Sequence, residues 1–200
     1  MIDFLKNSFD RLPISQNNKE IFNLPNSITM VRIAVMPVLF FLLLSPGRIF
    51  SLIIAILFIA ASITDFLDGY IARRYNIVTK MGKLLDPIAD KLLISTAMIM
   101  MIPIGRIPAW IVAIIIMRDV FVDGLRSIAS SEGLIIQARA LGKQKTLCQI
   151  IAVSALLIHY PIFWIDSHVV GTVVLYIALV LTVWSGADYY WQFHRDIIKK

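Results

Sequence analysis

The chain has 200 residues, of which 58% are hydrophobic and only 16% are charged, whereas about 25% of an average soluble domain is charged. Folding buries only about 70% of the surface of a chain this long, so a soluble domain could not hide this much apolar surface, and the excess is expected to face lipid. The net charge of +6 does not indicate a nucleic-acid partner, because the basic residues are scattered between long apolar stretches.

The N-terminal residues 1–23 form a juxtamembrane segment before the first long apolar stretch. Within it, Ile2, Leu5, Phe9 and Leu12 fall on one face of a helix. This pattern is typical of a short helix that lies in the membrane interface. A flexible terminus is the alternative interpretation.

Six apolar segments follow, each long enough to cross a hydrocarbon core of about 30 Å as a helix. They cover residues 26–45, 49–75, 83–104, 108–130, 143–163 and 168–191. Most Lys and Arg lie at the two termini and in the loops after the second and fourth segments, whereas the opposite loops have only Arg48 and Arg106. Because positive loops favour the cytoplasm, the sequence predicts an all-α integral membrane protein. We expect one domain over residues 1–200, with six transmembrane helices and both termini in the cytoplasm.

Four aspartates lie at the adjoining ends of the second and third segments. Asp65 and Asp68 are three residues apart, and Asp86 and Asp90 are four apart. Each spacing puts the pair on one helix face, and the short connection makes the two helices antiparallel neighbours. The four carboxylates should therefore converge near the inner membrane surface, where they need a positive partner because like charges repel.

The positive partner is either a divalent metal ion or a set of basic side chains. Oxygen ligands without Cys or suitably spaced His favour hard cations such as Mg²⁺ or Mn²⁺. The alternative is ion pairing with the basic residues Arg73, Arg74, Lys80, Lys83 and Lys91. A metal beside basic residues suggests a diphosphate substrate, and Arg73 could bind phosphate oxygens with its planar fork of donors.

Small residues beside the aspartates indicate room for a ligand. Gly69 follows Asp68 directly, and Ala72 lies near it on the same helix. Tight packing against another helix is the alternative, since small residues are common at helix contacts in membranes. Gly82 could serve the turn between the helices or allow the same close approach.

Together these residues resemble the signature of the CDP-alcohol phosphotransferase family. All eight fixed positions match, with the family's spacing: Asp65, Asp68, Gly69, Ala72, Arg73, Gly82, Asp86 and Asp90. The resemblance implies a six-helix membrane enzyme, usually a homodimer, in which an alcohol hydroxyl attacks the β-phosphorus of a CDP-linked donor and CMP is released.

The resemblance also implies a role for each signature residue. One or two Mg²⁺ or Mn²⁺ ions would bind to Asp65, Asp68, Asp86 and Asp90, and Asp90 would also accept the proton of the alcohol. Gly69, Ala72 and Gly82 would border the cytidine nucleotide, and Arg73 would contact phosphate. Metals of this kind neutralise charge on a diphosphate, and a carboxylate beside them can take a proton.

Further segments resemble the bacterial members of this family that use CDP-diacylglycerol as donor and sn-glycerol 3-phosphate as acceptor. They are residues 23–41, 85–93, 108–133 and 141–146. The resemblance implies anionic phospholipid synthesis at the cytoplasmic face of a bacterial inner membrane. One departure is visible: those members commonly have Gly-Arg-Glu where this chain has Met117, Arg118 and Asp119, which keeps the charge pattern.

Two kinds of alternative function remain. The same donor could serve another acceptor, either phosphatidylglycerol or inositol phosphate. A metal-ion transporter could use the four carboxylates as its transport site. Transport sites tend to lie near the bilayer midplane on broken helices, whereas these aspartates lie at helix ends. This position favours the enzyme.

An acceptor that carries a phosphate needs further cations, and four are candidates. Arg118 lies inside an otherwise apolar segment, which makes it a functional-site hypothesis. Arg126 lies eight residues later on nearly the same face, and Lys143 and Lys145 follow in the next cytoplasmic loop. We expect these four to hold glycerol phosphate. The alternative is that Arg118 pairs with an acid and that the loop cations contact anionic lipid.

Asn26 and Thr29 lie at the start of the first segment. Both could donate hydrogen bonds to the nucleotide. Capping of the helix N-terminus by Asn26 or Ser27 is the alternative.

Overall fold

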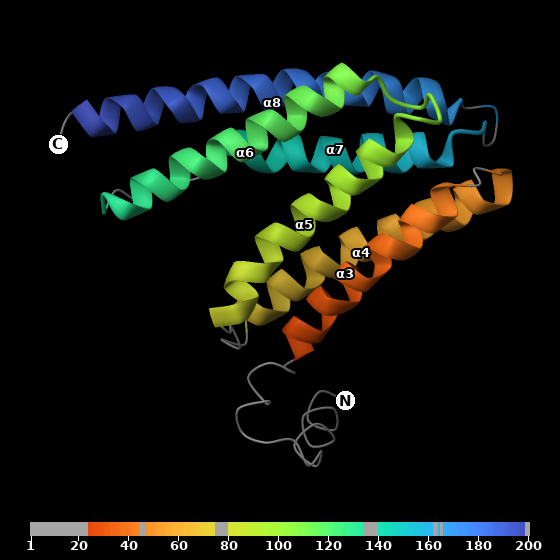
Figure 1. Ribbon diagram of the computed structural model, residues 1–200, viewed down its shortest axis with the longest axis horizontal. Coiled ribbons are helices and arrows are strands. Elements are labelled where there is room, and N and C mark those ends of the chain that lie inside the picture. Colours follow the sequence, from red (N-terminus) through yellow and green to blue (C-terminus); the bar gives the residue numbers. More distant parts are fainter. Residues whose placement is uncertain are drawn as a thin grey trace, which may run out of the picture.

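The computed structural model describes residues 24–44, 47–74, 80–133, 140–161, 164 and 166–198. Within these ranges the chain forms six helices and no strand (Figure 1). The helices are α3 (Leu24–Leu43), α4 (Arg48–Arg74), α5 (Lys80–Met101), α6 (Ala109–Ser131), α7 (Ala140–Ile158) and α8 (Ser167–Ile198). The predicted all-α class is therefore confirmed for the described residues. The predicted interfacial helix in residues 1–23 lies outside them.

Some side chains within the helices also lie outside the described residues. They belong to residues 24–29 and 31 of α3, 65–74 of α4, 80–87 of α5, 140, 141 and 143 of α7, and 198 of α8. For these positions the structure gives the helix and the place along it.

Each of the six predicted segments overlaps one of these helices, and the differences lie at the ends. The helix α7 ends at Ile158, before the predicted limit of 163, because His159 adopts a left-handed backbone conformation with φ of 62°. The helix α8 continues to Ile198, beyond the predicted limit of 191. The helix α3 begins at Leu24, so Asn26 and Ser27 lie inside it, and the alternative in which one of them caps the helix is wrong.

Local sequence accounts for where two of the helices begin and end. Pro108 precedes α6 with an extended backbone, at φ −68° and ψ 132°, and proline cannot donate the backbone hydrogen bond that a helix interior needs. Gly133 follows α6 with φ of 72°, a conformation that glycine adopts without strain. The carboxylate of Asp166 accepts hydrogen bonds from the backbone N–H groups of His168 at 2.9 Å and Val169 at 3.3 Å, and so caps α8.

The helices pack as two groups that α7 connects. Helices α3, α4 and α5 contact one another, α6 packs against α8, and α7 packs against both α4 and α8. Figure 1 shows the end of α4 and the start of α5 together at the lower end of the molecule. The chain between them has only residues 75–79, which keeps these two ends close.

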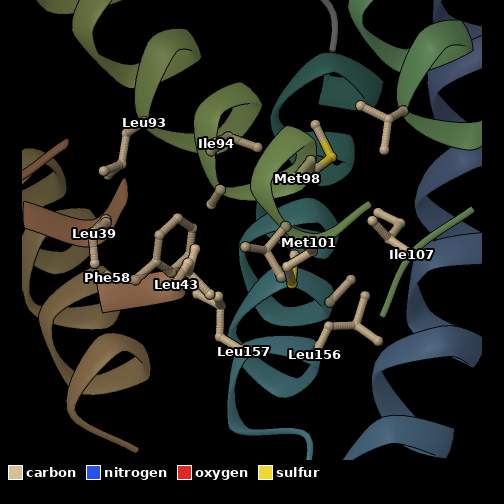
Figure 2. Close-up of a cluster of buried hydrophobic side chains, with 14 of the residues drawn as sticks. Leu39, Leu43, Phe58, Leu93, Ile94, Met98, Met101, Ile107, Leu156 and Leu157 are labelled. Carbon is tan, nitrogen blue, oxygen red and sulfur yellow. The ribbon is translucent and has the colours of Figure 1, made fainter. Parts of the chain in front are cut away.

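A buried apolar core fixes α4 and α5 against α3 and α7 (Figure 2). It includes Phe58 of α4, which is fully buried, and Met98 and Met101 of α5. Leu39 of α3 and Leu156 of α7 also belong to this core. Because this core is closely packed, a shift of one helix would displace its neighbours. The core therefore fixes the positions of α4 and α5, the helices that carry the aspartates.

Arg106 adds a polar contact at the other end of α5. Its guanidinium is buried and donates to the carbonyl oxygen of Leu157 and to the hydroxyl of Ser51, both at 2.7 Å. Burial lowers the pKa of Arg106 from its usual value, and nearby Tyr160 acts in the opposite direction. Arg106, which the sequence placed in a loop, thus connects α4, α7 and the α5–α6 loop.

The outer surface of the bundle is strongly apolar. Trp184 and Trp191 of α8 and Phe41 of α3 are each more than 60% exposed. Among the described helices, only α8 is long and apolar enough to cross a membrane, over Ser167–Ile197 with mean hydropathy 2.1. Shorter apolar stretches occupy Arg32–Leu43, Arg48–Thr64 and Gln144–Ile158. Membrane crossing by the other five helices stays a prediction.

Candidate active site

The four aspartates occupy the adjoining ends of α4 and α5, which we call the aspartate end. Asp65 and Asp68 lie in the last three turns of α4, and Asp86 and Asp90 lie in the second and third turns of α5. Ten other predicted site residues supply no described side-chain contact: Asn26, Thr29, Asp65, Asp68, Gly69, Ala72, Arg73, Gly82, Asp86 and Lys143. Their predicted roles stay predictions.

Asp90 is the one signature aspartate whose side chain the structure describes. It is half-buried on α5, between the fully buried Ala89 and the half-buried Lys91. Lys91 donates to the carboxylate of Asp123 on α6. This ion pair connects the turn that carries Asp90 to the middle of α6. It also gives Lys91 a partner on another helix, whereas one interpretation of the sequence paired it with the four aspartates.

A second carboxylate of α6 binds two cations. Asp119 Oδ1 accepts from Lys145 Nζ of α7 and, at 3.0 Å, from Arg118 Nη1. Asp119 precedes Asp123 by about one helical turn. One carboxylate of α6 thus binds a lysine of α7, and the other binds a lysine of α5.

Lys145 is buried, with a side chain only 7% exposed. The prediction that Lys145 lies in a cytoplasmic loop is wrong. The helix α7 begins at Ala140, so Lys145 already lies in its second turn, and the side chain extends between helices toward Asp119. A buried ammonium group requires such a partner, because an unpaired charge in a low-dielectric interior is costly.

The guanidinium of Arg118 extends across to α8. Its Nε donates to the carbonyl oxygen of Thr182 at 3.1 Å, and its Nη2 donates to the hydroxyl of Ser185 at 2.9 Å. With the contact to Asp119, every guanidinium nitrogen has a protein partner. These contacts agree with the alternative in which Arg118 pairs with an acid. Its predicted role in acceptor binding is not tested by them.

Three polar residues of this site were not singled out from the sequence. Thr182 and Ser185 of α8 and Gln149 of α7 are all buried, and Gln149 Nε2 donates to Thr182 Oγ1 at 3.3 Å. We call the connected residues the α6 network: Arg118, Asp119, Lys145, Gln149, Thr182 and Ser185. Thr182 and Ser185 are three residues apart on one face of an apolar helix. This spacing was the sequence signal for a contact with another helix, since such residues form hydrogen bonds between helices in membranes.

Arg126 lies on the same side of α6 as Arg118. Its guanidinium carbon lies 5.9 Å from the centre of the Tyr189 ring, within the range of a cation–π contact. Arg118 and Arg126 thus reach successive turns of α8, as expected for residues on nearly one face. Arg126 itself is exposed, in contrast to the buried Lys145 and the partly buried Arg118 of the α6 network.

The described side chains contain no group of three or more His, Cys, Asp or Glu that could share a metal ion. Asp119 and Asp123, the acids of α6, bind lysines. The four carboxylates of the aspartate end remain the predicted ligands of a hard divalent cation.

Comparison with known proteins identifies relatives over nearly the whole chain. The sequence model of the CDP-alcohol phosphatidyltransferase family matches residues 22–184. The CDP-diacylglycerol–glycerol-3-phosphate 3-phosphatidyltransferase of Bacillus subtilis (strain 168) is 46% identical over 181 residues, which cover 84% of this chain and 94% of the relative. The enzyme of the same name from Rickettsia bellii (strain RML369-C) is 39% identical, with 84% and 93% covered. That of Salmonella choleraesuis (strain SC-B67) is 32% identical, with 88% and 98% covered.

Proposed function

Because this chain belongs to the CDP-alcohol phosphatidyltransferase family, we propose that it transfers the phosphatidyl group of CDP-diacylglycerol to sn-glycerol 3-phosphate. The products are phosphatidylglycerophosphate and CMP, and the reaction belongs to anionic phospholipid synthesis. The observation that carries this proposal is 46% identity to a relative named for this reaction, over 94% of that relative's length. It favours the transferase over a metal-ion transporter.

The proposed setting is the inner membrane of a bacterium, crossed by all six described helices. The length and hydropathy of α8 and the exposed apolar side chains of α3 and α4 support it. With basic residues concentrated in the loops beside the aspartate end, both termini and the active site would face the cytoplasm. There the site meets water-soluble glycerol phosphate as well as the lipid donor.

Mg²⁺ or Mn²⁺ is the proposed cofactor, held by Asp65, Asp68, Asp86 and Asp90. Four carboxylates without sulfur or nitrogen ligands fit a hard divalent cation. When bound, such an ion neutralises charge on the diphosphate and makes CMP a better leaving group. The aspartates themselves hold the ion at the membrane surface.

The proposed proton acceptor is Asp90. As the acceptor hydroxyl oxygen bonds to the β-phosphorus, its proton passes to the carboxylate of Asp90. The bond from that phosphorus to the bridging oxygen breaks, and CMP leaves with the electron pair. Half-burial of Asp90 limits access of bulk water, which would otherwise compete as the attacking group.

The remaining signature residues would bind the donor. Gly69, Ala72 and Gly82 lack bulk and would let the cytidine nucleotide approach the helices. Arg73 would bind diphosphate oxygens. Asn26 and Thr29, in the first turns of α3, would donate hydrogen bonds to the same nucleotide.

The acceptor phosphate would bind to cations of α6 and α7, namely Arg118, Arg126, Lys143 and Lys145. The ion pair between Lys91 and Asp123 supports this assignment, because it brings α6 beside the turn of Asp90. We further propose that the chain is a homodimer, as the family resemblance implies.

Release of CMP from purified protein tests this function. The reaction contains CDP-diacylglycerol and Mg²⁺ or Mn²⁺, with glycerol 3-phosphate, phosphatidylglycerol or inositol phosphate in parallel. We expect CMP with glycerol 3-phosphate alone. Release with another acceptor would replace the proposed acceptor, and no release with any acceptor from folded protein would reject the transferase.

A further inference from the structure

The contact between α6 and α8 is close at Gly186. A Cβ atom built on Gly186 would lie 3.0 Å from Cγ and 3.1 Å from Nε of Arg118. Carbon atoms in good contact are separated by about 3.5–4.0 Å, so a larger residue would require the arginine side chain to shift by a few tenths of an ångström. Other glycines differ: a Cβ on Gly124 of α6 would meet nothing within 4 Å.

The arginine that rests on Gly186 has a fixed orientation. Thr182 accepts from Nε and Ser185 accepts from Nη2, both on α8. The Ser185 hydroxyl in turn donates to the Thr182 carbonyl oxygen at 3.1 Å. The planar guanidinium cannot rotate without losing these contacts. Its third nitrogen, Nη1, is thereby directed at Asp119.

The cluster of Arg118, Asp119 and Lys145 carries a surplus positive charge. It contains two cations and one carboxylate, and the three side chains are only 14%, 20% and 7% exposed in that order. The neighbouring pair of Lys91 and Asp123 is balanced. A partly buried surplus cation is unfavourable unless an anion joins it, so this cluster is suited to a phosphate.

The two cations of this cluster are not equivalent, however. Arg118 uses each of its nitrogens on protein acceptors. The ammonium group of Lys145 has three donors, and it donates to the carboxylate of Asp119. Lys145 is therefore better suited than Arg118 to contact a phosphate directly.

We propose that Gly186 is a positioning residue for the acceptor: it admits Arg118 against α8, Arg118 orients Asp119, and Asp119 holds Lys145 for the phosphate of glycerol 3-phosphate. This inference rests on the proposed function. It separates the cations by role, since Lys145 touches the substrate and Arg118 acts through Asp119. A methyl group at position 186 should then disturb acceptor binding without touching the donor.

The test is the kinetics of CMP release by Gly186→Ala with each substrate varied in turn. We expect the KM for glycerol 3-phosphate to rise about tenfold, as for the weakening of a charge-assisted contact. The KM for CDP-diacylglycerol should stay within about twofold, which is the scatter of a neutral change. Ser185→Ala removes one acceptor of Arg118 without adding bulk, and it should raise the KM for glycerol 3-phosphate by a smaller factor. This variant replaces Gly186→Ala as the test if Gly186→Ala does not fold.

Two matched glycine variants separate positioning from packing. Gly124→Ala adds a methyl group in open space and should leave both KM values unchanged. Gly171→Ala in α8 would put Cβ 2.8 Å from Leu156 Cγ and 2.9 Å from Leu156 N, so it should lower stability without a selective change in KM.

The outcomes distinguish this inference from the function on which it rests. No CMP release by the unmodified chain would reject the function. An active chain in which Gly186→Ala and Ser185→Ala leave the acceptor KM unchanged, or raise both KM values equally, would overturn the positioning role alone.

Discussion

The aspartate end and the α6 network are built in different ways. The aspartate end is a local feature, contained within residues 65–90 and held by two consecutive helices. The α6 network is assembled from α6, α7 and α8, and its contact from Arg118 to Ser185 joins residues 67 positions apart. A local signature is readable from spacing, whereas an assembled network depends on how the helices pack.

This difference suggests a division of labour. The aspartate end contains the groups proposed for chemistry that any acceptor alcohol would need. The α6 network contains buried cations suited to one acceptor that carries a phosphate. Changes at the aspartate end should therefore lower turnover, and changes in the α6 network should raise the KM for glycerol 3-phosphate.

Removal of divalent metal should have the largest effect. A chelator should lower CMP release by at least about 10³-fold, because charge stabilisation by the ion is worth several kcal/mol. Activity should return when Mg²⁺ or Mn²⁺ is added in excess, and the helical content measured by circular dichroism should not change. Undiminished CMP release in the presence of the chelator would contradict the proposed metal site at the aspartate end.

Asp90→Asn should be next in size. We expect kcat to fall about 10²–10⁴-fold, the usual contribution of a general base, while binding of CDP-diacylglycerol is largely kept. Asp196→Asn is the matched control, since Asp196 lies near the end of α8 beside Arg195, and it should retain full turnover. A normal kcat for Asp90→Asn would show that a group other than Asp90 accepts the proton.

A comparison of Arg118→Ala with Arg126→Ala probes the network itself. Arg118 is only 14% exposed and makes three contacts, so its loss should raise the KM for glycerol 3-phosphate by about tenfold or more, as for bonds to charged groups. Arg126 is exposed, and its loss should raise that KM only about two- to fivefold, as expected for a solvent-screened charge. Equal rises in the acceptor and donor KM for Arg118→Ala would contradict the assignment of this network to the acceptor.

Arg106→Met should have the smallest effect on activity. It removes two buried hydrogen bonds at the opposite end of the bundle, and we expect a loss of about 1–3 kcal/mol in the free energy of unfolding. Both KM values should be unchanged in the folded protein. Thermal unfolding in detergent measures the first quantity, and a selective rise of either KM would show that this end also influences substrate binding.

The sequence predicted the helices better than it predicted the network. Long apolar stretches predict helices with few competitors, so each of the six segments overlaps one, and the ends differ where a residue such as His159 leaves the helix. The network escaped prediction because Thr182 and Ser185 are common, uncharged residues in an apolar stretch. Their importance depends on α8 packing against α6, which spacing along the chain does not specify.

Lys145 shows the same limit for a charged residue. The sequence predicted a loop position for Lys145, because charged residues near a membrane helix usually mark the helix end. The structure buries it instead, since Asp119 on another helix compensates the charge. A charge pattern in sequence identifies cations, but only tertiary packing determines which of them are buried with a partner.

The central claim is that the chain joins a lipid donor to glycerol 3-phosphate. Its most direct test is incorporation of radiolabelled sn-glycerol 3-phosphate into chloroform-soluble lipid by the purified chain. We predict labelled phosphatidylglycerophosphate, with one CMP released per labelled lipid, only when CDP-diacylglycerol and Mg²⁺ or Mn²⁺ are present. Folded protein that binds CDP-diacylglycerol but labels no lipid would contradict the account.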